Sequence, residues 1–87
     1  MELHQLAKKE RQRVMEAFTH IKIVDEKAKD VIGLAKSYRV DAEHFYEMAE
    51  YVSAFELYVY IFGMLDALAR LKMIDPGEAR RHFKIDQ

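Results

Sequence analysis

The sequence predicts an all-α protein: a three-helix up-down bundle followed by a short C-terminal helix. Apolar residues recur with the 3.6-residue period of a helix along most of the chain. Only three Gly and one Pro interrupt the 87 residues, and no stretch alternates polar and apolar residues for long enough to form a strand. We expect helices over about residues 2–22, 26–49, 51–73 and 76–83, all within a single domain of residues 1–87.

The first helix, residues 2–22, has an apolar stripe that one acidic residue interrupts. At about 100° per residue, its apolar side chains fall within about 120° of one another. Glu10 lies inside this stripe. The stripe consists of Leu3, Leu6, Ala7, Val14, Ala17, Phe18 and Ile21.

The second helix, residues 26–49, can be capped by Asp25, and its apolar residues share an arc of about 160°. Arg39 is the charged residue within that arc. If the first two helices form an antiparallel hairpin around residues 22–25, Glu10 and Arg39 lie at the same level. We therefore predict an interhelical ion pair between Glu10 and Arg39.

The third helix, residues 51–73, is apolar around more than half of its circumference, which is typical of a central helix. Two neighbouring helices can cover only part of such a surface. We therefore expect the remaining apolar surface to bind a second copy of the chain or another protein. The candidate interface consists of Val52, Val59, Tyr60, Gly63 and Ala67.

The C-terminal segment begins with Asp75, Pro76 and Glu78, which supply a cap, a first-turn proline and an acid at the third helical position. This pattern predicts a short helix over residues 76–83. Phe83 and Ile85 could cover the third helix in place of a partner, which is the main alternative to the predicted interface.

Composition argues against several classes of function. The chain has no Cys, so disulfides and thiolate zinc sites are absent, and a cytoplasmic location is expected. A net charge of −1 and a pI near 6.4 lack the basic excess of nucleic-acid-binding domains. The longest apolar run, Leu57 to Leu65, is shorter than the roughly 20 residues that span a bilayer, so we expect no membrane partner. The absence of Asn and Cys together with many charged residues is typical of thermophilic proteins.

Two short motifs carry a resemblance to a known family. Asp41, Ala42 and Phe45 form an Asp-Ala-x-x-Phe element, and residues 63–67 read Gly-x-Leu-Asp-Ala. With these elements the chain resembles an archaeal helical family catalogued as domain of unknown function 357. The resemblance implies an archaeal source and a compact helical fold, and it implies no activity. The chain departs from the family pattern at Ala49-Glu50, where Gly-Asp is expected in the turn.

Asp66 is the polar residue that the third helix places among its apolar residues. An unpaired buried carboxylate would cost several kcal/mol, so Asp66 needs a partner. Arg70, four residues later, has the spacing that favours an ion pair on a helix. We therefore predict that Asp66 is largely buried and paired for structural reasons.

An alternative interpretation is that the chain binds nucleotides or nucleic acid, or acts as a ribonuclease, through Arg39 and His44. These residues match an Arg-x4-His spacing found in helical ribonucleases, but they point about 140° apart on a straight helix. Asp41, His44 and Glu47 could offer metal ligands, although carboxylate sites in bundles also need acids from a facing helix. We assign no catalytic, cofactor or metal residues. A non-enzymatic interaction module is the function that the sequence favours.

Overall fold

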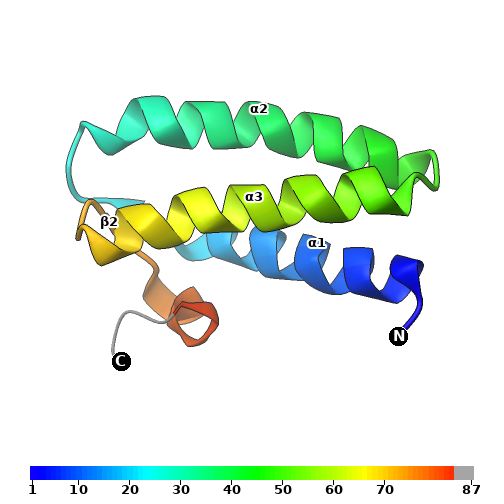
Figure 1. Cartoon of the computed structure of the whole chain (residues 1–87). Helices are drawn as coiled ribbons and strands as arrows, with labels where there is room; N and C mark the ends of the chain where they lie inside the picture. The colour runs from blue at the N-terminus through cyan, green and yellow to red at the C-terminus, as the bar shows by residue number, and fades with distance from the viewer. Residues whose placement is uncertain (84–87) are drawn as a thin grey trace.

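The computed structural model describes residues 1–83 of the chain (Figure 1). Its three main helices are α1 (Leu3–His20), α2 (Ala28–Glu47) and α3 (Tyr51–Arg70). Two short antiparallel strands, β1 (Lys22–Ile23) and β2 (Ile74–Asp75), and a 3-10 helix, η1 (Gly77–His82), complete the described part. The predicted all-α class is therefore confirmed, with three helices packed against one another and a minimal sheet at one end.

The helix α3 lies between α1 and α2 and packs against both (Figure 1). Small residues on the flanking helices, such as Ala17 and Ala35, are fully buried and let the larger side chains of α3 approach closely. The central position predicted for this helix follows from its composition. Its buried residues are Ala54, Tyr58, Ile61, Phe62, Leu65, Leu68 and Ala69.

Contacts between α1 and α2 are made mainly by long side chains, because α3 separates their backbones over most of their length. Arg11 on α1 reaches Glu43 on α2, and the guanidinium of Arg39 on α2 lies 5.1 Å from the ring centre of Phe18 on α1. Where α1 begins and α2 ends, the rings of His4 and Tyr46 lie 5.8 Å apart. The seam between α1 and α2 is thus polar and aromatic, whereas the core surrounds α3.

The small sheet corrects the prediction that the first helix runs to residue 22 and that the chain has no strands. Ile21 already has an extended backbone, with φ −66° and ψ 144°. Lys22 then pairs with Asp75 and Ile23 with Ile74. β-Branched residues favour the extended conformation, and a local pattern cannot reveal that a distant strand offers a partner. The sheet ties the start of α2 to the end of α3.

Helices α2 and α3 end earlier than the predicted residues 49 and 73, and both ends have the same geometry. Ala49 and Lys72 adopt left-handed conformations, with φ 59° and 60°. The N–H of Glu50 then donates to the Phe45 carbonyl at 2.9 Å, and the N–H of Met73 to the Leu68 carbonyl at 2.9 Å. These are Schellman motifs, which satisfy the last carbonyls of a helix.

The C-terminal segment forms η1 (Gly77–His82) where an α-helix over residues 76–83 was predicted. The carboxylate of Asp75 accepts a hydrogen bond from the Gly77 N–H at 2.9 Å, but Pro76, and not Asp75, is the N-cap residue of η1. Glu16 on α1 holds the other end, because it pairs with Arg81 at 2.6 Å and with His82 at 2.8 Å. The 3-10 helix therefore packs on α1.

Candidate functional site

One apolar surface of the described chain is the exposed side of α3, which borders α2 where Tyr60 meets Tyr38. Three large apolar side chains are exposed there: Val52 at 50%, Val59 at 40% and Tyr60 at 55%. Gly63 and Ala67 are exposed as well, and a Cβ atom built on Gly63 would meet nothing within 4 Å. We call this surface the outward face of α3, and define it as Val52, Glu56, Val59, Tyr60, Gly63, Ala67 and Arg70.

The C-terminal segment, as far as the structure describes it, does not cover the outward face. Phe83 is buried, and its ring lies 4.8 Å from that of Phe62, on the side of α3 near η1 and α1. Figure 1 shows η1 beside α1, away from α2. Of the two residues expected to compete with a partner, Phe83 thus packs elsewhere, and Ile85 lies outside the described residues.

Asp66 borders the outward face and is paired with Arg70, its predicted partner. The Nε of Arg70 lies 3.1 Å from Oδ2 of Asp66. The Asp66 side chain is 27% exposed, so most of it is buried. Its second carboxylate oxygen, Oδ1, is buried and has no hydrogen-bond partner among the described residues.

A polar network that joins all three helices was not foreseen from the sequence. Arg11 on α1 forms two bonds to the carboxylate of Glu43 on α2, with Nε 2.7 Å from Oε2 and Nη2 3.0 Å from Oε1. Tyr58 on α3 is fully buried, and its hydroxyl donates a hydrogen bond to Oε2 of the same carboxylate. The one sequence signal was Tyr58 itself, since a buried tyrosine hydroxyl needs a partner.

The electrostatics of this network fit a structural role. Burial raises the pKa of Glu43, but the hydrogen bonds from Arg11 and Tyr58 outweigh burial and hold that pKa below its ordinary value. Burial and the bond to Glu43 raise the pKa of Tyr58 well above the usual range, so the phenol stays protonated. A neutral phenol, a carboxylate and a guanidinium that satisfy one another leave no group poised for proton transfer.

The ion pair expected between Glu10 and Arg39 is replaced by other contacts. Glu10 pairs with Arg13 of its own helix at 2.7 Å, and Arg39 lies over the ring of Phe18. Among residues 1–83, the ion pair between α1 and α2 is Arg11–Glu43. The predicted register assumed a tight turn after α1, whereas residues 21–27 include β1 and shift the two helices relative to each other.

A family model described as protein of unknown function (DUF357) matches residues 4–74. The chain belongs to this family. The match runs from the first turn of α1 to the start of β2, so the family domain includes both the three-helix network and the outward face. No curated protein and no solved structure gives a significant match. η1 lies beyond the matched residues of this family member.

Arg39 and His44, the residues of the alternative interpretation, line the same shallow hollow on α2. Its volume is about 340 Å³, and its other lining residues are Val40, Glu43 and Glu47. His44 is exposed and also borders a second hollow of about 470 Å³, which Tyr38, Asp41, Phe45 and Leu57 line as well. The first hollow contains two carboxylates, which repel phosphate groups.

Metal ligation by Asp41, His44 and Glu47 has no geometric support. Within residues 1–83, no three His, Asp or Glu side chains come together as a group that could hold a metal ion. All three residues are exposed, on the side of α2 away from the core. Successive turns of one helix provide ligands from one side only, and no acid from α1 or α3 completes the set.

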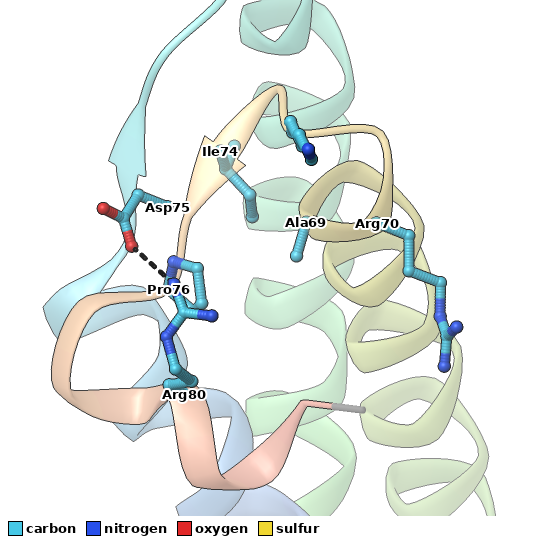
Figure 2. A pocket seen from close by; sticks show the side chains of 7 residues that line it. Ala69, Arg70, Ile74, Asp75, Pro76 and Arg80 are labelled. Atoms are coloured by element: carbon cyan, nitrogen blue, oxygen red, sulfur yellow. Dashed lines mark ion pairs between the residues drawn. The ribbon is translucent and has the colours of Figure 1, made fainter. Parts of the chain in front are cut away.

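A third hollow lies where α3, β2 and η1 meet, as Figure 2 shows. Its volume is about 280 Å³, and the side chain of Arg80 reaches from η1 to within 3.6 Å of the Asp75 carboxylate. Ile74 and Pro76 form its buried wall. This arrangement holds the C-terminal segment against the sheet.

The helix α3 is long and apolar enough, by length and composition, to cross a membrane, and it is the one such helix in the described part of the chain. The sequence expectation counted only the longest uninterrupted apolar run and missed this property. Core helices of water-soluble proteins pass the same test, and 39% of the apolar 18-residue stretch of α3 is buried inside the fold. The rest of its apolar surface includes the outward face.

Proposed function

We propose that the chain is a non-enzymatic helical interaction module whose working surface is the outward face of α3. In this proposal the three helices form an up-down bundle that leaves one side of its central helix uncovered. The observation that carries it is the exposure of Val52, Val59 and Tyr60 on one side of the most apolar helix. Large exposed apolar patches are uncommon on monomers and usually mark an interface.

The partner is a second copy of the chain or another protein, and the expected setting is the cytoplasm. Aromatic residues are enriched at such interfaces, and Tyr60 supplies one that Tyr38 supports from α2, with ring centres 5.4 Å apart. Gly63 and Ala67 add little bulk, so a facing helix can approach closely. The hydrogen-bonded network at Glu43 keeps the three helices together and is not itself a reaction centre.

Affinity capture from native cells, read by mass spectrometry, tests this proposal with two matched variants. Val59→Glu places a charge on the outward face, whereas Val40→Glu places the same charge on α2, where Val40 is 69% exposed. We expect Val59→Glu to lose the captured protein, including any second copy of the chain, and Val40→Glu to keep it. Loss with Val40→Glu alone would contradict the proposal and favour the hollows around His44.

The alternative, a nucleotide-binding or ribonuclease-like domain that uses Arg39 and His44, has less support. The two residues do share a hollow, but Glu43 and Glu47 line it too. Arg39 is also occupied by its contact with the Phe18 ring. RNA binding that Arg39→Ala and His44→Ala both abolish, without loss of folding, would establish this alternative.

A further inference from the structure

We infer that the outward face of α3 binds a second copy of itself in antiparallel orientation, with Gly63 on the two-fold axis. This inference rests on the proposed function and names the partner. It starts from the two charges of the outward face. Glu56 and Arg70 are the charged residues of that surface, and they lie seven residues before and seven residues after Gly63.

This spacing places the three residues on one line along the helix. Seven residues turn an α-helix by about 700°, which is only about 20° short of two full turns, and advance it by about 10.5 Å. The line therefore carries an acid at one end, a glycine at its centre and a base at the other end. A surface with this order is complementary to itself after a two-fold rotation about Gly63.

In the antiparallel pair, residues equally far before and after Gly63 face each other across the axis. Glu56 of each copy then lies level with Arg70 of the other, so opposite charges meet twice. A parallel pair would instead place Glu56 beside Glu56 and Arg70 beside Arg70, which costs energy because like charges repel. The charges of the outward face thus select one orientation.

Two further residues of the face fit the same arrangement. Tyr60 and Ala67 lie on one side of the central line, three residues before and four residues after Gly63. The ring of Tyr60 in one copy is therefore placed over Ala67 of the other, a large side chain against a small one. The open space at Gly63 lets the two backbones approach at the crossing point.

The ion pair within each chain is compatible with the pair between chains. Asp66 engages Nε of Arg70. A guanidinium carries five N–H donors, so its terminal nitrogens can bind a second carboxylate. The Arg70 side chain is 53% exposed, and Glu56 is exposed one turn beyond Val52. In the dimer Arg70 lies between Asp66 of its own chain and Glu56 of the other.

Single-cysteine variants test the orientation, because the chain has no Cys. We would prepare Glu56→Cys, Gly63→Cys and Arg70→Cys, and treat each with a short bismaleimide crosslinker. Gly63→Cys should crosslink to itself, and an equimolar mixture of Glu56→Cys and Arg70→Cys should give the mixed product by intact mass. Equally efficient self-crosslinking of Glu56→Cys would overturn the inference, because it indicates a parallel pair.

A charge exchange tests the ion pairs by light scattering. The wild type should have twice the 10.3 kDa mass of one chain. Glu56→Arg should weaken the dimer by about tenfold or more in Kd, since like charges then meet twice, and Glu56→Arg with Arg70→Glu should restore it. A wild type that stays at 10.3 kDa up to millimolar concentration would refute the inference. The proposed function would still stand if the capture experiment shows a partner that Val59→Glu loses.

Discussion

At the scale of single residues, Glu43 is the side chain that joins the helices: its carboxylate accepts hydrogen bonds from Arg11 of α1 and Tyr58 of α3. Through these bonds the one carboxylate links α1, α2 and α3. The carboxylate stabilises the fold because it provides a hydrogen-bond partner for the buried Tyr58 hydroxyl and for the half-buried Arg11 guanidinium.

Glu43→Gln keeps the size of the side chain and removes its charge. We expect the free energy of unfolding to fall by about 1–3 kcal/mol, because the charge-assisted bonds from Arg11 are lost and the Tyr58 hydroxyl keeps a weaker acceptor. Urea denaturation measures this. Glu47→Gln, an exposed change on the same helix, should alter stability by less than about 0.5 kcal/mol. Equal effects of the two variants would argue against the network.

The same residue predicts a pH dependence. Because the pKa of Glu43 is lower in the folded chain than its ordinary value of 4.5, unfolding takes up a proton at acid pH. Its stabilising contribution is therefore complete above the ordinary pKa and disappears as the pH falls through the lowered one. Urea titrations of wild type and Glu43→Gln should differ at pH 7 and converge below pH 4.5. A constant difference across this range would show that ionisation of Glu43 is irrelevant.

Gly77 and Gly33 form a matched pair of glycines with opposite expected effects. Gly77 has φ +56°, and a Cβ there would lie 2.8 Å from the His20 carbonyl oxygen, so Gly77→Ala should destabilise the fold by about 1–3 kcal/mol. A Cβ on Gly33 meets nothing within 4 Å inside α2, so Gly33→Ala should stabilise it by about 1 kcal/mol. Thermal unfolding by circular dichroism compares them. A stable Gly77→Ala protein would show that η1 is not held against α1 as described.

At the scale of elements, the C-terminal ends of α2 and α3 each have a non-glycine residue in the left-handed region, Ala49 and Lys72. This region costs about 1–2 kcal/mol for an ordinary residue. The family pattern expected Gly-Asp where the chain has Ala49-Glu50, and Ala49 nevertheless adopts the geometry that glycine favours. The turn thus lies at the residues that the family resemblance indicated, although the helix predicted over residues 26–49 included Ala49.

Ala49→Gly and Lys72→Gly should each raise the free energy of unfolding by about 0.5–1 kcal/mol, because glycine removes the Cβ strain and loses part of that gain to backbone entropy. The melting temperature should rise by a few degrees for each change. Lys36→Gly in the exposed middle of α2 is the control and should lower stability by about 1 kcal/mol. A decrease with Ala49→Gly would mean that the observed turn is not the one present in solution.

At the scale of the whole molecule, the proposed dimer would link stability to association. Because only folded chains would form it, mass action predicts that the melting temperature rises with protein concentration. We expect this for the wild type between micromolar and hundreds of micromolar, and not for Glu56→Arg. Differential scanning calorimetry at several concentrations measures it. Concentration-independent melting of the wild type would place the chain among stable monomers.

Local periodicity by itself determined the helical class, the side of each helix that is buried and the pairing of Asp66 with Arg70, because residues three and four apart on a helix always lie close together. It also indicated that Val52, Val59 and Tyr60 exceed what two neighbours can cover.

Only the tertiary structure decided which residues meet across helices. Arg11 and Glu43 are 32 positions apart, and their contact depends on how the segment between α1 and α2 runs. That segment pairs as β1 with β2 from the other end of the family domain, a contact that no local pattern encodes. The resulting shift moved the ion pair of the seam from Glu10 and Arg39 to Arg11 and Glu43, because a register between helices is set by the connections and the core that position them.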